Sequence, residues 1–141
     1  MIVVIVTCKD KEEATKIAKR LLEKKLVACA KVLPAAHSLY LWPPKSGKIK
    51  EADEIMLIAK TLESKWETIE KEVLSLHSYK NPEIYAVPVS HVSKKYLNWV
   101  SGELRKSKKA RAYESMWKIL EKPTKGKPMG ASEEDKAIYD I

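Results

Sequence analysis

The stretch VACAKVLPAAHSLYLWPPKSGKIKEADEIMLIAKT at residues 27–61 decides the fold. Residues 27–42 and 48–61 are rich in apolar, β-branched and aromatic side chains, which predicts two strands. Between them lies PPKSG, residues 43–47, where proline cannot donate to a ladder and glycine accepts a positive φ, so a turn is expected. The stretch is therefore predicted to be a hairpin of two strands of about 14 residues each, far longer than the usual 5 to 6.

The segment before this hairpin predicts a strand followed directly by a helix. Residues 2–6, IVVIV, are apolar and β-branched throughout, as expected of a central strand buried on both faces. Asp10 and Glu13 then form a capping-box pair, and the helix they begin is expected to end near Lys25. Its apolar positions recur at helical spacing: Ala14, Ile17, Ala18, Leu21 and Leu22.

The segment after the hairpin repeats the pattern of helix and strand. Ser64 and Glu67 form a second capping-box pair, which predicts a helix with Ser64 as its N-cap. One face of this helix is apolar: Trp66, Ile69, Val73 and Leu76. Residues 84–89 predict a fourth strand, in which Pro88 indicates an edge position or a bulge. Ser93 is expected to cap a third helix.

The order of elements is strand, helix, strand, strand, helix, strand, helix. This order predicts an α+β fold, a ferredoxin-like βαββαβ sandwich with a long hairpin between its second and third strands. Residues 1–101 form this domain, and residues 102–141 are a C-terminal extension. Long strands on a small sheet need edge partners, so a cyclic assembly of identical chains is expected.

The C-terminal extension begins with a basic run, residues 104–111. An amphipathic helix is predicted over about 107–121, with Tyr113, Met116, Trp117 and Leu120 along one face. Residues 123–130 predict a linker, and Ser132 with Asp135 is expected to cap a short terminal helix. Three roles remain open for the extension: packing on the assembly, binding a partner protein through its helix, or contacting nucleic acid through the basic run.

Composition excludes several classes of protein. The net charge is +8, but lysine and glutamate are interleaved along the chain, so nucleic acid is an unlikely partner. Two cysteines without a CxxC motif favour a reduced, cytoplasmic protein. No apolar stretch is long enough to span a bilayer, and no membrane partner is expected. The abundance of lysine and glutamate is typical of a thermophile.

Six short blocks, in order over about 100 residues, resemble the CutA family of divalent-cation tolerance proteins. They are LVACA at 26–30, SLYLW at 38–42, GKI at 47–49, KT at 60–61, HSYKNPE at 77–83 and YLNW at 96–99. The extension lies outside the family pattern. The resemblance implies a homotrimer like the PII signalling proteins, with long strands interlocking around a threefold axis and Tyr40, Trp42 and Trp99 at the interfaces.

The resemblance also implies a role in metal tolerance or homeostasis, with Cu²⁺ or another divalent cation bound. His77 and Glu83 match the family's motif histidine and glutamate. The family's thiol on the first strand and its second histidine fall at Val6 and Leu76 here. Cys8 lies on the same strand face as Val6 by period-two geometry, so the expected metal ligands are His77, Glu83 and Cys8.

A second expected site is a cleft between subunits that binds a small ligand or an anion. Cys29, Lys60 and Tyr79 are its candidate residues, and a polar network that only stabilises the trimer is the alternative. Lys80 adds positive charge beside His77, which disfavours a cation there. No nucleophile and base occur at a usable spacing, so the protein is not expected to be an enzyme.

Overall fold

The computed structural model describes residues 1–105 and 108–121. The chain divides into two compact units, Met1–Leu104 and Arg105–Ile141, which are described separately. The predicted linker and terminal helix lie outside the described residues. The first unit holds β1 (Ile2–Cys8), α1 (Lys11–Glu23), β2 (Cys29–Leu41), β3 (Ile49–Thr61), the 3₁₀ turn η1 (Glu63–Lys65), α2 (Trp66–Leu76), β4 (Ile84–Pro88) and α3 (Lys94–Leu104). The second holds α4 (Lys108–Glu121).

The four strands form one antiparallel sheet in the order β2-β3-β1-β4. This is the strand order of the ferredoxin-like βαββαβ fold, so the predicted α+β fold is confirmed. β1 pairs with β3 on one side and β4 on the other. The edge position predicted from Pro88 is also confirmed, because β4 is an edge strand and a missing N–H on its outer side breaks no ladder bond.

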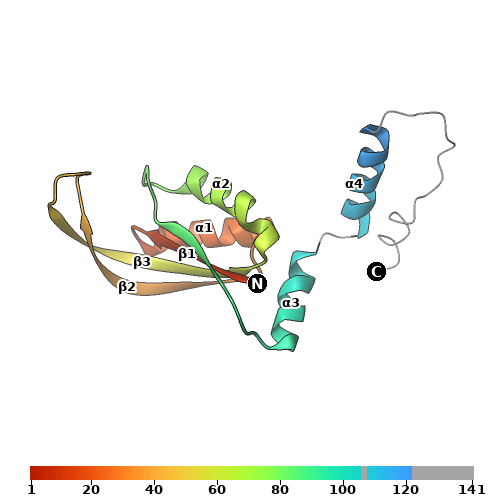
Figure 1. Ribbon diagram of the computed structural model, residues 1–141, viewed down its shortest axis with the longest axis horizontal. Coiled ribbons are helices and arrows are strands. Elements are labelled where there is room, and N and C mark those ends of the chain that lie inside the picture. The colour runs from red at the N-terminus through yellow and green to blue at the C-terminus, as the bar shows by residue number, and fades with distance from the viewer. Residues whose placement is uncertain (106–107, 122–141) are drawn as a thin grey trace. The chain divides into compact units, whose positions relative to one another are not determined.

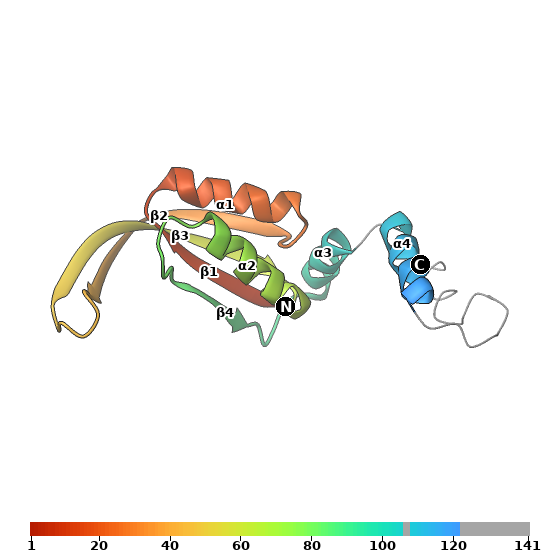
Figure 2. The ribbon, with the colours of Figure 1, turned by 90° about the horizontal axis from the view of Figure 1, so that it is seen from above.

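The core lies between one face of the sheet and the helices α1 and α2, which run side by side over it (Figure 2). It contains Val4 and Val6 of β1, Leu57 of β3, Ile17 and Leu21 of α1, and Ile69 and Val73 of α2. The expectation that β1 is buried on both faces is wrong for the single chain, because Val3 and Ile5 on the opposite face are only half-buried. On that face α3 contacts β3 and buries Val100.

The hairpin of β2 and β3 extends well past the two covering helices (Figure 1). Its ladder runs to the pair Leu41 and Ile49, with an irregularity between Leu33 and Ala36, where Pro34 cannot donate a ladder bond. The far part of this arm leaves large apolar side chains in solvent, with Leu41 68% and Ile49 70% exposed. A single chain therefore does not bury the surface that its own strands create.

Two of the three helix N-caps expected from the sequence are present in the structure. Asp10 Oδ1 accepts the N–H of Glu13 at 2.8 Å, and Ser93 Oγ accepts the N–H of Tyr96 at 3.2 Å, so both predicted caps are confirmed. The predicted Ser64 cap is wrong. Residues Glu63–Lys65 form the 3₁₀ turn instead, and α2 begins after Lys65 without a side-chain cap. A 3₁₀ turn satisfies some of the free backbone groups that a capping side chain would otherwise bind.

Candidate metal-binding site

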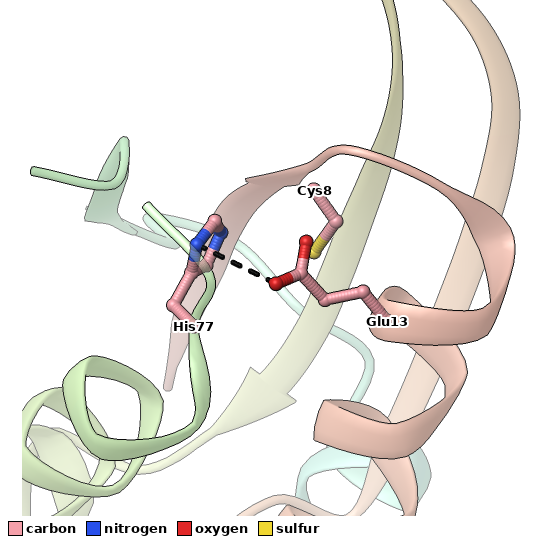
Figure 3. Close-up of side chains that lie close together, drawn as sticks. All are labelled: Cys8, Glu13 and His77. Atoms are coloured by element: carbon pink, nitrogen blue, oxygen red, sulfur yellow. Dashed lines mark ion pairs between the residues drawn. The ribbon is translucent and has the colours of Figure 1, made fainter. Parts of the chain in front are cut away.

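Three side chains of metal-ligand type converge at one end of the first unit. Cys8 is the last residue of β1, Glu13 lies in the first turn of α1, and His77 follows the last residue of α2. Their ligand atoms lie within 4.8 Å of one another, and all three residues are buried. Figure 3 shows them pointing toward one another from their separate elements. A thiol, a carboxylate and an imidazole together are the donor set of a zinc or copper site.

The short connection between β1 and α1 brings Glu13 to the end of the strand. Only Lys9 and Asp10 separate the two elements, and Asp10 fixes the helix start by accepting the Glu13 N–H. The Glu13 side chain reaches back, and its Oε2 accepts the N–H of Lys9 at 3.0 Å. The capping arrangement therefore places a carboxylate directly beside Cys8.

The imidazole of His77 uses both of its nitrogens. Nε2 lies 2.7 Å from the carbonyl oxygen of Thr7, and Nδ1 accepts the N–H of Tyr79 at 3.1 Å. A carbonyl only accepts, so Nε2 carries the proton and the ring is the neutral tautomer with a lone pair on Nδ1. His77 thereby ties the segment after α2 to the end of β1.

The carboxylate of Glu13 also uses both of its oxygens. Oε2 binds Lys9 as above, and Oε1 accepts the N–H of Ser78 at 2.7 Å. Burial alone would raise the pKa of Glu13, but the hydrogen bonds from Ser78 and Lys9 lower it below its ordinary value. Glu13 is therefore ionised at neutral pH.

The thiol of Cys8 is protonated at neutral pH. Burial, with the negative charges of Glu13, Asp10 and Glu54 acting in the same direction, raises the pKa of Cys8 to about 12. Thiolate is the form that binds metals. A metal ion bound here must displace the proton of Cys8.

The donor set therefore fits zinc or copper in chemical type, but the lone pair on Nδ1 of His77 is occupied by the N–H of Tyr79. Bond lengths of about 2.0 to 2.3 Å in a tetrahedral site put ligand atoms roughly 3.5 Å apart, so atoms spread over 4.8 Å would have to approach by about 1 Å. Nδ1 of His77 is the nitrogen that can be released, because the Tyr79 N–H it accepts lies at the longer distance of 3.1 Å. Metal binding thus requires a local rearrangement at residues 77–79.

Two of the three predicted ligands, Cys8 and His77, are brought together, and Glu83 is not part of the cluster. Glu83 Oε2 accepts the hydroxyl of Thr7 at 2.9 Å, and its backbone carbonyl accepts the N–H of Thr7 at 3.1 Å. Glu13, which the sequence indicated only as a capping residue, supplies the carboxylate instead. The sequence did contain a signal for this role of Glu13, because a capping-box glutamate immediately after a strand reaches back toward that strand's end.

The three residues predicted to form a ligand cleft lie in two separate places within one chain. Tyr79 donates its hydroxyl to Oε2 of the buried Glu54 at 3.0 Å, and burial together with that carboxylate raises the pKa of Tyr79 to about 12. Cys29 and Lys60 are cross-strand partners at the other end of β3. Glu54 and Lys60 are six residues apart on one strand, a separation of about 20 Å.

Two aromatic residues that the sequence did not connect with Cys29, Tyr96 and Trp99, lie near it. Cys29 Sγ lies 3.3 Å from the hydroxyl of Tyr96, and this contact is the first cause that raises the pKa of Tyr96. The ring of Tyr96 packs at a tilt on Trp99, with centroids 5.8 Å apart. Trp99 itself is half exposed, as are the other two predicted interface residues, Tyr40 and Trp42.

Comparison with known proteins matches the first unit and not the extension. The family model described as CutA1 divalent ion tolerance protein matches residues 2–103. The divalent-cation tolerance protein CutA of Archaeoglobus fulgidus is 41% identical over 97 residues, covering 69% of this chain and 91% of that protein. The protein of the same name from Citrobacter koseri is 38% identical over 104 residues, covering 74% of this chain and 88% of its own length.

Solved structures agree with these sequence matches. The periplasmic divalent cation tolerance protein CutA of Archaeoglobus fulgidus superimposes with a TM-score of 0.70 at 39% identity, covering 74% of this chain and all of the other. CutA1 of Pyrococcus horikoshii superimposes with a TM-score of 0.69 at 37% identity, covering 75% of this chain and all of the other. None of the helices described here is long and apolar enough to cross a lipid bilayer.

Proposed function

Since this chain belongs to the family of CutA1 divalent ion tolerance proteins, we propose that it is a homotrimer that binds a divalent cation, copper in the first instance, in a PII-like sensing or homeostatic role. The observation that carries the proposal is the convergence of the Cys8 thiol, the Glu13 carboxylate and the His77 imidazole within 4.8 Å. Their donor types suit copper and zinc.

Each residue of the proposed site has a separate task. Cys8 gives up its proton and supplies a thiolate, and Glu13 supplies an oxygen that is already ionised. His77 binds through Nδ1 after releasing the N–H of Tyr79. Its Nε2–H bond to the Thr7 carbonyl stays in place and keeps the ring oriented, as a hydrogen bond from the other ring nitrogen does for metal-binding histidines.

The exposed apolar surface of the β2–β3 arm supports the trimer. Leu39, Leu41 and Ile49 are 61%, 68% and 70% exposed in one chain, an exposure that association with further copies would remove. Tyr40, Trp42 and Trp99 lie half exposed and would contact the neighbouring subunits. An arm that extends past the helices covering the sheet, and so stays uncovered itself, has the form of a strand-pairing element.

The trimer would also assemble the proposed ligand cleft. Within one chain Tyr79 lies about 20 Å along β3 from Cys29 and Lys60, so all three can line one cleft only if they come from different subunits. A small anion held by Lys60 is the ligand that this arrangement favours. The cleft thus depends on the same assembly as the interface residues.

We further propose a binding protein of the cytoplasm, not an enzyme. A raised thiol pKa of about 12 at Cys8 is the opposite of the activation that a catalytic cysteine requires. Both cysteines are free thiols, which suits a reducing compartment. The Archaeoglobus fulgidus relative is described as periplasmic, so fractionation of cells into cytoplasm and envelope tests this assignment directly.

The proposed function is tested by titrating the metal-free protein with Cu²⁺ and with Zn²⁺ by calorimetry, with its mass in solution measured alongside. One ion per chain of a trimer is expected. Binding should be lost in His77→Ala and kept in His91→Ala, which removes an exposed histidine outside the cluster. A trimer that binds neither ion would overturn the metal assignment, and a monomer would overturn the assembly.

A further inference from the structure

The helix α4 lies in the part of the chain that the family match does not cover. The match ends at residue 103, and α4 runs over Lys108–Glu121. The family therefore indicates no role for α4, and a role is inferred from the apolar side chains and the charge of this segment. Four large apolar side chains follow one another at helical spacing, namely Tyr113, Met116, Trp117 and Leu120, and they are 54%, 47%, 59% and 59% exposed.

These four side chains form a single face. At 100° per residue they occupy an arc of about 100° on the helix, while the exposed Lys118 lies on the opposite side. An isolated helix of this length is marginal in water, because helices shorter than about 12 to 15 residues gain too little to offset their nucleation cost. A surface that accepts the apolar face would stabilise the helix.

The charge next to this face is strongly positive. In the sequence, five of the seven residues 105–111 are lysine or arginine. Three such segments brought together in a trimer would repel one another, so a bundle of three α4 helices is disfavoured. A negatively charged occupant is favoured instead.

We propose that α4 is a surface-binding helix for anionic lipid bilayers, which lies in the headgroup layer with its apolar face inserted and the basic run on the phosphates. Tyrosine and tryptophan prefer the boundary between headgroups and acyl chains, and methionine and leucine enter the apolar layer below it. Nucleic acid would use the positive charges and the aromatic rings, whereas a bilayer also offers an apolar layer for the side chains of Met116 and Leu120. The basic residues add electrostatic attraction to an anionic surface.

The helix is too short to span a bilayer, which agrees with surface binding. Fourteen residues rise about 21 Å, against a hydrocarbon thickness of about 30 Å. The proposal revises the sequence-based expectation that no membrane is a partner. It rests on the proposed function only for the strength of membrane binding, because a trimer carries three copies of the helix and gains avidity from them.

The test uses the full chain in a flotation assay with vesicles of phosphatidylcholine alone or mixed with phosphatidylglycerol. The protein is expected to float with the anionic vesicles, more weakly as salt rises, and with increased helicity by circular dichroism. The double variant Trp117→Glu with Leu120→Glu should lose at least about tenfold in partitioning. Leu74→Glu, a matched change of an exposed leucine on α2, should partition as the unchanged protein does.

Several results would overturn the proposal. They are no flotation with anionic vesicles, equal flotation of the Trp117 and Leu120 double variant, or equal binding to vesicles without phosphatidylglycerol. Binding of RNA without binding of vesicles would assign the basic run to nucleic acid. Association of trimers that depends on Trp117 would assign the apolar face to a second copy. Because vesicle binding needs no metal ion, these outcomes are separate from the metal titration.

Discussion

Nδ1 of His77 and Oε1 of Glu13 lie 3.8 Å apart, and each accepts a different backbone N–H of the segment that follows α2. Glu13 takes the N–H of Ser78 and His77 takes that of Tyr79. The two side chains therefore hold residues 77–79 against the end of β1 when no metal is bound. The candidate metal ligands thus also stabilise the fold, so a substitution there is expected to change both metal affinity and the free energy of unfolding.

Replacing His77 should destabilise the protein as well as abolish metal binding. His77→Ala removes the bond from Nε2 to the Thr7 carbonyl and leaves that buried oxygen without its donor. The loss is expected to be about 2 kcal/mol in the free energy of unfolding, measured by denaturant titration of the metal-free protein. His91→Ala, at an exposed position, is the control and should change little. An unchanged stability in His77→Ala would show that the bond contributes nothing.

Glu13→Gln should make the protein less stable at neutral pH and remove part of its sensitivity to acid. The pKa of Glu13 is lowered in the folded chain, so its stabilisation is complete above the unfolded value of about 4.5 and is lost as the pH falls through the lower folded value. The stability difference between Glu13→Gln and the unchanged protein should therefore shrink on acidification below about pH 4. Glu12→Gln, the exposed neighbour, is the matched control. A difference that stayed constant with pH would contradict this account.

Metal affinity should rise with pH because Cys8 must be deprotonated. With the pKa of Cys8 at about 12, binding releases one proton, and the apparent affinity is expected to increase about tenfold per pH unit near neutrality. Calorimetry in buffers of different ionisation enthalpy measures the released proton. Cys8→Ser should remove the pH dependence and Cys29→Ser should keep it. A pH-independent affinity would exclude Cys8 as a ligand.

His37 on the arm should titrate above its ordinary pKa. Its Nδ1 lies 2.8 Å from Asp53, its cross-strand partner, and its Nε2 lies 3.4 Å from Glu51. The hydrogen bond to Asp53 is the main cause that raises the pKa of His37. Any stabilisation of the fold by His37 is present below its pKa of about 6.5 in the unfolded chain, and it is lost as the pH rises through the higher pKa of the folded chain. Nuclear magnetic resonance should show the His37 pKa fall in Asp53→Asn, and an unchanged His37 pKa in that variant would contradict this account.

Charges on the arm should dissociate the proposed trimer. Leu41 and Ile49 face each other across the ladder, and both are largely exposed in one chain. Leu41→Asp with Ile49→Asp is expected to reduce the mass in solution from three chains to one, as measured by light scattering on a size-exclusion column. Leu74→Asp tests an exposed leucine of α2 and should leave the mass unchanged. A trimer that survives the double change would move the interface away from the arm.

Periodicity and turn chemistry in the sequence determined the strands, the helices and their order. The alternating and helical patterns on either side of PPKSG predicted the βαββαβ fold, because period and turn residues are local properties of the chain. The Asp10 and Ser93 caps were predicted for the same reason. The Ser64 cap was predicted wrongly, because a 3₁₀ turn competes with the capping box and only the packed chain decides between them.

Only the tertiary structure decided which residues meet. Cys8, Glu13 and His77 come from three elements up to 69 residues apart in sequence, and only their packing shows that Glu13 and not Glu83 lies beside Cys8 and His77. The protonation of the Cys8 thiol and the ionisation of Glu13 depend on burial and on neighbouring charges, which exist only in the folded chain. The family and the elements follow from the sequence, whereas the composition and state of the site follow from long-range packing.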